Sequence, residues 1–256
     1  MNTRSWVWVA FVVLWAGCAS PARTPADAGM PQDAEVKPGM SRRAMRLWLR
    51  ADQGVVASDG KVSRWKDQSG GGRDAIMSSV PRQPSLRRGA LNDNPVVHFD
   101  GAQSLYLEAL VEPTVFTVFV VGKNNETEEH AFSMILGPGG NEANNQLRWQ
   151  NGTEVLAVGT GNNMPVVRTS IGDTRTWHLL TLHYDGSTLR LYRNGKPVGN
   201  HDFSTQGPWT FAQVGGYYSE HFAKADLAEV LVYDDALLGG EREAVEHYLK
   251  SKYRLD

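Results

Sequence analysis

Residues 177–199 read WHLLTLHYDGSTLRLYRNGKPVG, and this stretch decides the fold class. Apolar and polar residues alternate on either side of Asp185–Gly186 and again on either side of Asn194–Gly195. Asp–Gly and Asn–Gly pairs favour the positive φ values that a two-residue hairpin turn requires. The pattern therefore predicts a meander of three antiparallel strands joined by two tight turns.

Strand signals continue on both sides of this meander. The run VEPTVFTVFVVGK, residues 111–123, is rich in β-branched and aromatic residues, which predicts a strand buried on both faces. Apolar residues alternate over residues 45–49, and residues 211–218 and 225–237 have the composition of two later strands. Many short strands separated by turns predict an all-β sandwich or barrel.

The period changes at the end of the chain, where a helix is predicted from Glu241 to Tyr253. Its apolar face carries Val245, Tyr248 and Leu249. Acidic residues precede basic ones along the segment, which suits the helix dipole. Glu246 and Lys250 have the spacing of an i,i+4 ion pair. The sequence therefore predicts one closing helix after the last strand.

The N-terminus has the proportions of a secretory signal. Arg4 precedes eleven consecutive apolar residues, from Trp6 to Ala16. Eleven residues rise about 16 Å as a helix, which is too short for the roughly 30 Å of a bilayer's hydrocarbon core. The segment is therefore predicted to direct export and not to span the membrane.

The end of this signal resembles the lipobox of bacterial lipoproteins. It carries Leu14, Ala16, Gly17 and Cys18. Trp15 stands where Leu is usual in that motif. The resemblance implies cleavage before Cys18 and acylation of its thiol, which anchors the chain to a lipid bilayer. No Asp follows Cys18, which implies the outer membrane of the cell envelope if the host is Gram-negative. An ordinary signal peptide, cut nearby with Cys18 incidental, is the alternative.

Composition divides the chain into three parts. Residues 1–17 form the predicted signal peptide, residues 18–43 a flexible tether rich in Pro and Ala, and residues 44–256 the body. The tether has four prolines and no aromatic residue, so it cannot bury enough apolar surface to fold.

Five segments of the body together resemble bacterial laminin G-like, concanavalin A-like domains. They are LWLRADQGV, VSRWKDQSGGGRDA, PVVHFDGAQSLYL, the meander of residues 177–199, and DLAEVLVYDDALLGGEREAVEHYLKSKYRL. The resemblance spans about residues 45–255 and implies a jelly-roll sandwich of two antiparallel sheets with a short C-terminal helix. This fold serves lectins, adhesion modules and glycoside hydrolases, so it does not decide the function.

No catalytic residues are predicted. The glycosidases that share this fold resemble laminarinases and carry E-x-D-x-x-E on one strand, which places the nucleophile and the general acid on one face. No Glu of this chain has an Asp two residues later. Asp226 and Glu229 are three residues apart, which predicts that they project from opposite faces of a strand. An enzyme whose acids come from separate strands remains an alternative.

Other ligand classes receive little support from the sequence. The net charge of −2 argues against a nucleic-acid partner. The seven histidines lack the spacing of a metal triad, and His178 is predicted to be structural. Calcium at a loop rim stays open as a cofactor. Its candidate ligands are Asp67, Asp100, Asp226, Glu126, Glu128 and Glu129. The alternative role of Asp67 and Asp100 is to hold turns through hydrogen bonds to the backbone.

A ligand site is predicted where aromatic and amide side chains are close in sequence. Trp149 follows the amides Asn144 and Asn145, and Tyr217 and Tyr218 follow two glycines. Flat aromatic faces contact the C–H groups of a sugar, and amides bond to its hydroxyls. The alternative is that these aromatic side chains only cap the sandwich. Three other tryptophans are predicted to lie in the core: Trp48, Trp65 and Trp177.

Together these observations predict a non-catalytic binding module, anchored to the envelope, for a glycan or an extracellular protein. A carbohydrate-active enzyme and a structural adhesion module are the alternatives.

Overall fold

The computed structural model describes residues 40–128, 131–139, 144–160, 165–218 and 221–256. The predicted signal peptide, Cys18 and the tether up to residue 39 lie outside these residues. The described residues belong to one compact unit, and Met40, within the range predicted as tether, is already buried. No helix of the described residues is long and apolar enough to cross a membrane.

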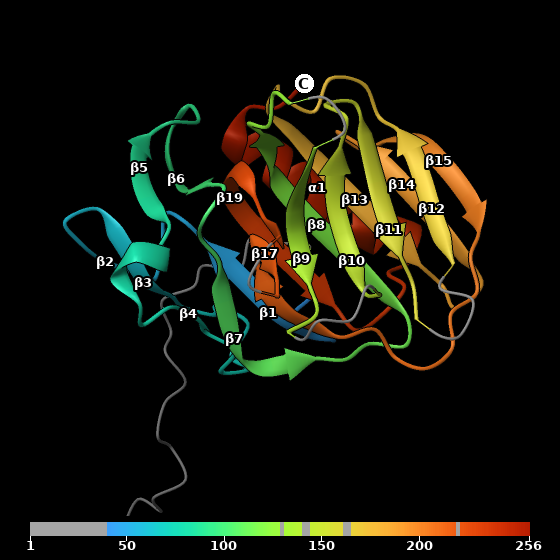
Figure 1. The fold of residues 1–256 in the computed structure, drawn as a ribbon. Helices are drawn as coiled ribbons and strands as arrows, with labels where there is room; N and C mark the ends of the chain where they lie inside the picture. The colour runs from blue at the N-terminus through green and yellow to red at the C-terminus, as the bar shows by residue number, and fades with distance from the viewer. Residues whose placement is uncertain (1–39, 129–130, 140–143, 161–164, 219–220) are drawn as a thin grey trace, which may run out of the picture. The chain divides into compact units, whose positions relative to one another are not determined.

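The strands form two antiparallel sheets whose inner faces share one apolar core (Figure 1). The first sheet is centred on β8 (Phe116–Asn124), which lies between β13 and β19. In order across the sheet, its first five strands are β15 (Lys196–Asp202), β14 (Thr188–Arg193), β13 (His178–Tyr184), β8 and β19 (Lys224–Tyr233). The far edge of β19 pairs with two strands, β1 (Met45–Arg50) along its C-terminal part and β6 (Asp93–Asp100) along its N-terminal part. β5 (Ser85–Gly89) pairs with β6.

The second sheet lies in front of the first in Figure 1. Its strands, in order, are β12 (Val166–Ser170), β11 (Glu154–Val158), β10 (Gln146–Gln150), β9 (Phe132–Gly137), β16 (Phe211–Val214), β7 (Leu105–Val111), β4 (Ala75–Ile76), β3 (Lys61–Trp65) and β2 (Val55–Ser58). A short ribbon of β17 (Gly216–Tyr217) and β18 (His221–Phe222) packs against β9, and a single turn of 3-10 helix spans Val80–Arg82. The fold is thus the predicted all-β jelly-roll sandwich.

The predicted meander is confirmed as β13, β14 and β15, which pair in sequence order. Asn194 and Gly195, between β14 and β15, have φ values of 51° and 79°, which is the turn that an Asn–Gly pair favours. In the first turn, the Asp185 carboxylate accepts hydrogen bonds from the backbone N–H groups of Ser187 and Thr188. Both turns are therefore fixed by the residues that predicted them.

Helix α1 (Gly239–Tyr253) covers the outer face of the first sheet at β8 and β13, and begins two residues before the predicted start. Its predicted apolar face is buried. Because of this cover, β8 is buried on both faces, as predicted. The predicted pair of Glu246 with Lys250 is wrong, since the Glu246 carboxylate instead lies 2.7 Å from the guanidinium of Arg242, one helical turn earlier.

A β-bulge in β19 changes the expected placement of its two acidic residues. The register shifts by one residue between Leu227 and Glu229. On β8, the residues opposite Asp226 and Glu229 are Lys123 and Val121, which lie on the same face of that strand. The prediction that Asp226 and Glu229 project from opposite faces is therefore wrong.

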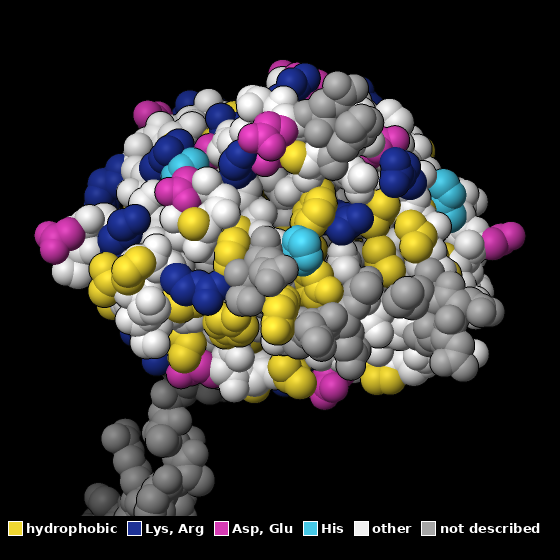
Figure 2. Space-filling view, in the orientation of Figure 1, with side chains coloured by type: hydrophobic (Ala, Val, Ile, Leu, Met, Phe, Trp, Pro, Cys, Tyr) yellow, Lys and Arg dark blue, Asp and Glu magenta, His cyan; other side chains and the backbone are white. Residues whose placement is uncertain are grey.

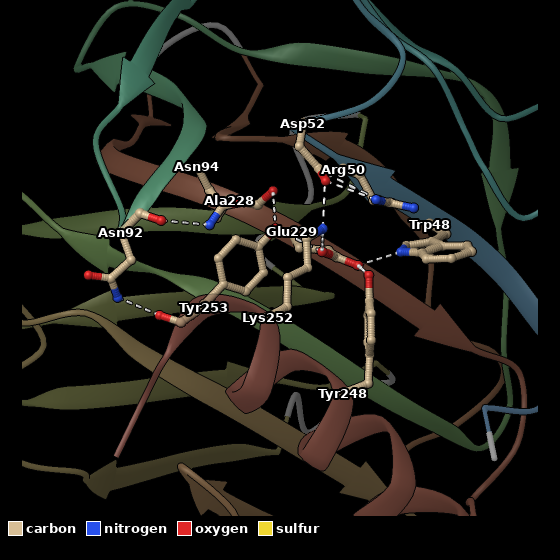
Figure 3. A network of polar contacts seen from close by, with 10 residues as sticks. All are labelled: Trp48, Arg50, Asp52, Asn92, Asn94, Ala228, Glu229, Tyr248, Lys252 and Tyr253. Carbon is tan, nitrogen blue, oxygen red and sulfur yellow. Dashed lines mark hydrogen bonds and ion pairs between the residues drawn. The ribbon is translucent and has the colours of Figure 1, made fainter. Parts of the chain in front are cut away.

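Glu229 holds α1 against the sheet through a network of hydrogen bonds (Figure 3). Its side chain is fully buried. One carboxylate oxygen accepts hydrogen bonds from Trp48 Nε1 at 2.6 Å and from the Tyr248 hydroxyl at 3.2 Å. The other accepts from Lys252 Nζ at 2.6 Å and from the Tyr253 hydroxyl at 2.8 Å. Burial, and then the charge of Glu229, raise the pKa of Tyr248 and Tyr253 well above the usual range, so both hydroxyls remain donors.

A second buried contact joins the two sheets to each other. Trp149 Nε1, on β10, donates a hydrogen bond to His178 Nε2, on β13, over 3.1 Å. The other ring nitrogen of His178 lies 2.8 Å from the carbonyl oxygen of Thr176 and therefore carries the proton. His178 is thus neutral in the folded state, because burial lowers its pKa to about 4. It has the structural role that the sequence predicts.

We expect Glu229→Gln to lower the free energy of unfolding by about 3 kcal/mol or more, because it breaks a buried ion pair and leaves the ammonium of Lys252 partly uncompensated. Calorimetric unfolding measures the change. Asp234→Asn is the matched control, since Asp234 pairs with Arg46 at the surface and its loss should cost less than about 1 kcal/mol. Equal losses in the two variants would contradict the structural role of Glu229.

A pH dependence follows from His178. Its pKa is about 4 when folded and 6.5 in its unperturbed state, so the unfolded chain binds more protons between these values. Stability should therefore fall as the pH decreases from 6.5 to 4, by about 1.4 kcal/mol for each pH unit within the window. Urea unfolding at several pH values measures this slope. The slope should be shallower in His178→Gln, and parallel profiles would contradict the assignment.

Candidate functional site

The residues predicted as ligand groups do not form one surface. Asn144 and Asn145 precede β10, and the Asn145 side chain is buried and donates to the Asn144 amide oxygen at 3.1 Å. Trp149 has no exposed surface. Tyr217 lies on β17 and is 9% exposed, whereas Tyr218, which follows it, is 43% exposed. Only the two tyrosines bring aromatic surface to the outside.

Trp149 requires a correction. It alternates with Leu147 on the inner face of β10, and both belong to the apolar core. Its indole N–H is occupied by His178. No face of the ring can therefore stack against a sugar, and its role is the core role that the alternative describes.

Strand alternation places a different side chain of β10 on the outer face. Arg148, between Leu147 and Trp149, faces outward, where its guanidinium lies 4.3 Å from the centre of the Phe132 ring on β9. The Phe132 ring is 5.3 Å from that of His221 on β18, and His221 stacks on Tyr217 at 5.1 Å with an interplanar angle of 5°. We name Phe132, Arg148, Tyr217 and His221 the aromatic–arginine cluster. Figure 2 shows hydrophobic, histidine and basic side chains gathered over this part of the second sheet.

Two glycines allow the β17–β18 ribbon to lie on β9. A Cβ on Gly137, in β9, would come within 2.7 Å of the carbonyl oxygen of Gly216. Gly215 has a φ of 72°, and a Cβ there would lie 2.3 Å from the Phe99 ring. Larger residues at either position would push the ribbon away. The position of Tyr217 and His221 against Phe132 thus depends on glycine backbone at both sites.

Arg148 is the one member of the aromatic–arginine cluster that carries a permanent charge. Its Nη1 donates to the Gln146 amide oxygen at 2.8 Å. Within the described ranges, no carboxylate pairs with Arg148, and its buried Nε has no hydrogen-bond acceptor. Burial, and then the nearby charge of Arg168, lower the pKa of Arg148. Arg168 itself pairs with Glu154 at 3.5 Å, so that carboxylate already has a partner.

A cavity of about 360 Å³ lies elsewhere, near the chain's C-terminus. Its lining includes Trp177, which the sequence places in the core but which is only half-buried in the structure. Lys123 Nζ lies 5.1 Å from the centre of the Trp177 ring. Three of the polar side chains that line the cavity, those of Asn92, Arg193 and Asn194, bond to backbone groups. The hydrogen bonds of these three side chains thus hold the surrounding loops.

Asp226 lies in a polar cluster between β6, β8 and β19. Arg87 Nη2 lies 2.7 Å from His98 Nε2, and since a guanidinium only donates, His98 Nδ1 carries the proton and donates to Asp226 over 2.6 Å. Burial opposes ionisation of Asp226 most strongly, but the hydrogen bond from His98 and the charge of Lys123 are among the favourable interactions that together outweigh it and lower the pKa of this carboxyl. Lys123 lies 3.6 Å from the second oxygen. Both acids of β19, Asp226 and Glu229, are thus occupied by neighbouring side chains.

Three of the six candidate calcium ligands, Asp67, Asp100 and Asp226, lie far apart in sequence, and Glu129 is outside the described residues. The Asp67 carboxylate accepts hydrogen bonds from the backbone N–H groups of Trp48, Ser69 and Arg73. Glu126 accepts from two backbone N–H groups of its own turn and pairs with Lys224 at 3.2 Å. In the part of the chain that the structure describes, no three acidic, histidine or cysteine side chains converge as metal ligands would.

Three of the four residues in the aromatic–arginine cluster, Phe132, Arg148 and His221, were not predicted as site residues from the sequence. The period-two pattern around Trp149 could have identified Arg148, because one residue of β10 must face outward if its neighbours face inward. Phe132 and His221 come from strands far apart in the sequence. Their approach depends on the register of β9 and of the ribbon, which a single sequence does not show.

Comparison with known proteins identifies similarities of family and of fold. A family model described as the concanavalin A-like lectin/glucanases superfamily matches residues 99–241. No curated protein matches the sequence significantly. A sialidase of Trypanosoma rangeli in complex with sialic acid has a TM-score of 0.54 and 14% identity, over 82% of this chain and 33% of the sialidase.

Two toxin domains are similar to about the same degree. The ligand-binding domain of botulinum neurotoxin serotype D, in complex with N-acetylneuraminic acid, has a TM-score of 0.55 and 12% identity over 81% of this chain. The binding domain of Paraclostridial mosquitocidal protein 1 has a TM-score of 0.55 and 13% identity over 82% of this chain. This chain spans 51% and 52% of those two structures. At these identities the similarity shows the fold alone.

Proposed function

Because the chain belongs to the concanavalin A-like lectin/glucanases superfamily, we propose that it is a non-catalytic carbohydrate-binding module. The observation that carries the proposal is the aromatic–arginine cluster on the outer face of β9 and β10. Aromatic rings that reach the surface beside polar donors are the usual elements of a sugar site, since the rings pack on C–H groups and the donors bond to hydroxyls.

The geometry of the cluster supports this role. Phe132 and His221 are half-buried, so part of each ring is open to solvent. They come from two different strands and are fixed by ring contacts with Arg148 and Tyr217. A platform that is rigid before binding loses little conformational entropy when a ligand docks.

The neighbours agree with a carbohydrate as the ligand class. The sialidase structure contains sialic acid, and the botulinum domain contains N-acetylneuraminic acid. This chain matches 33% of the first and 51% of the second, so the sugar of each neighbour supports the class of ligand and not the position of the site.

We propose a non-catalytic role because the two acidic side chains of β19 are buried and already bonded to other side chains. Glu229 is fully buried and accepts four hydrogen bonds, and Asp226 is 3% exposed beside His98 and Lys123. A glycosidase needs one carboxyl group that can give a proton to the substrate and another that can reach the anomeric carbon. These two carboxyl groups contact protein side chains instead.

We further propose that the binding module is anchored in the cell envelope through acylated Cys18. The proposal rests on the lipobox-like end of the signal sequence and on the Pro- and Ala-rich segment that follows it. The proposed tether runs from Cys18 to residue 39, and roughly 22 residues of flexible chain would reach about 23–28 Å, which would hold the jelly roll clear of lipid headgroups.

A glycan array probed with the full-length protein in mild detergent tests the ligand class. Phe132→Ala should weaken binding to the best glycan by about fivefold, because loss of one stacking ring removes roughly 1 kcal/mol. Val56→Ala, which shortens an exposed side chain on β2, is the control and should bind normally. Loss of binding in Trp177→Ala but not in Phe132→Ala would move the site to the cavity. No binding to any glycan would refute the proposed function.

The anchor is tested by membrane partitioning. The unsubstituted protein should sediment with membranes, and Cys18→Ser should appear in the soluble fraction, because the variant lacks the thiol that takes the acyl chains. Detergent extraction and mass spectrometry of the N-terminal peptide measure the attached lipid. Equal partitioning of both proteins would contradict acylation at Cys18.

A further inference from the structure

We infer that the aromatic–arginine cluster selects glycans that carry a carboxylate, and that Arg148 is the residue that binds it. The inference rests on the proposed function, because it names the class of sugar that the same site takes. The first observation is that the described residues of this surface do not balance the positive charge of Arg148. Arg148 is a partly buried guanidinium to which no described residue supplies a counter-ion.

An unpaired and partly buried charge is costly for a protein to keep. Elsewhere on the same sheet the chain avoids this cost, since Arg168, on β12, has Glu154 within 3.5 Å. Arg168 and Arg148 both lie opposite Leu156 on the strand between them. Among the described residues, one of these two arginines therefore has a carboxylate partner and the other has none. An anionic ligand would complete the second pair.

The guanidinium of Arg148 is also held in place before any ligand arrives. It lies over the Phe132 ring at 4.3 Å, and its Nη1 bonds to Gln146 at 2.8 Å. No described residue accepts a hydrogen bond from its Nε or Nη2. Because Nε is buried, only the terminal nitrogens Nη1 and Nη2 can meet a ligand. A guanidinium fixed by stacking and by one hydrogen bond presents the remaining N–H groups of these two nitrogens in a fixed plane, which suits the planar oxygens of a carboxylate.

The neighbours of Arg148 favour a sugar acid over other anions. The partly exposed rings of Phe132 and His221 offer stacking surface for a pyranose next to the cation, and the buried ring of Tyr217 supports His221 from behind. A phosphate group carries close to two negative charges at neutral pH, and the cluster has one permanent positive charge. One carboxylate beside one sugar ring matches both the single charge and the aromatic platform.

The test compares glycans that differ only in the acidic group. Isothermal titration calorimetry of the full-length protein in mild detergent measures 3′-sialyllactose against lactose, and a glucuronic acid-terminated disaccharide against its glucose-terminated counterpart. At least one acidic glycan should bind about tenfold or more tightly than its neutral partner, because a charge-assisted pair forms in only one of the two complexes. The advantage should shrink as salt is added.

Three variants assign the selectivity to a residue. Arg148→Gln should abolish the preference for acid, so that the acidic glycan and its neutral partner bind this variant with equal affinity. Arg148→Lys keeps the charge but loses the planar fork, so it should retain part of the preference. Arg168→Gln is the matched control, because it removes an equal charge from the same sheet and should leave the preference intact. Thermal unfolding of each variant shows whether it is folded.

Each outcome decides between the inference and the function on which it rests. Neutral and acidic glycans bound equally well would overturn the inference and leave the proposed function standing. A preference that survives in Arg148→Gln, or disappears in Arg168→Gln, would overturn the role of Arg148. If Arg148→Gln does not fold, the salt dependence and the Arg148→Lys result decide the inference. If no glycan binds at all, both proposals fail.

Discussion

The arrangement of the first sheet depends on one buried carboxylate. Glu229 has no exposed surface, and a carboxylate in such a place is tolerated only if its oxygens are fully bonded. Four donors meet it: one from β1 and three from α1. These donors can converge only when β1 pairs beside β19 and the helix lies across both. The bonds to Glu229 therefore fix both the position of α1 on the sheet and the pairing of β1 with β19.

The two outer faces of the sandwich differ in how their charged side chains are paired. Under α1, the network of Glu229 includes Asp52 and Arg50 as well as the helix residues, and each charge of the network has a partner. On β10, the described residues supply no counter-ion to Arg148, and its buried Nε has no hydrogen bond. A partly buried charged group without a counter-ion is expected where a protein keeps binding capacity at the cost of stability.

Much of the fold could be predicted from the sequence, because strand period and turn chemistry act locally. Asn194–Gly195 and the continuous apolar run of β8 each specified a structure that the neighbouring residues alone decide. Glu229 and Arg148 were not predicted as key residues, since their roles depend on contacts between distant segments. The bulge in β19 had the same effect on Asp226, because one extra residue reverses the alternation from which the faces were predicted. Trp149 was predicted to bind a ligand because its neighbours in sequence are polar, but its side chain faces the core.

The inner and outer faces of β10 are linked through the rigidity of one strand. On the inner face, Trp149 bonds to His178 of the opposite sheet. On both edges, β10 pairs with β9 and β11, so its backbone cannot rotate to move a side chain from one face to the other. Arg148 is adjacent to Trp149 in this strand and must therefore face outward. The contact that buries the tryptophan thus also holds the guanidinium in place on the surface, and the core of the sandwich positions the charge on which the proposed selectivity depends.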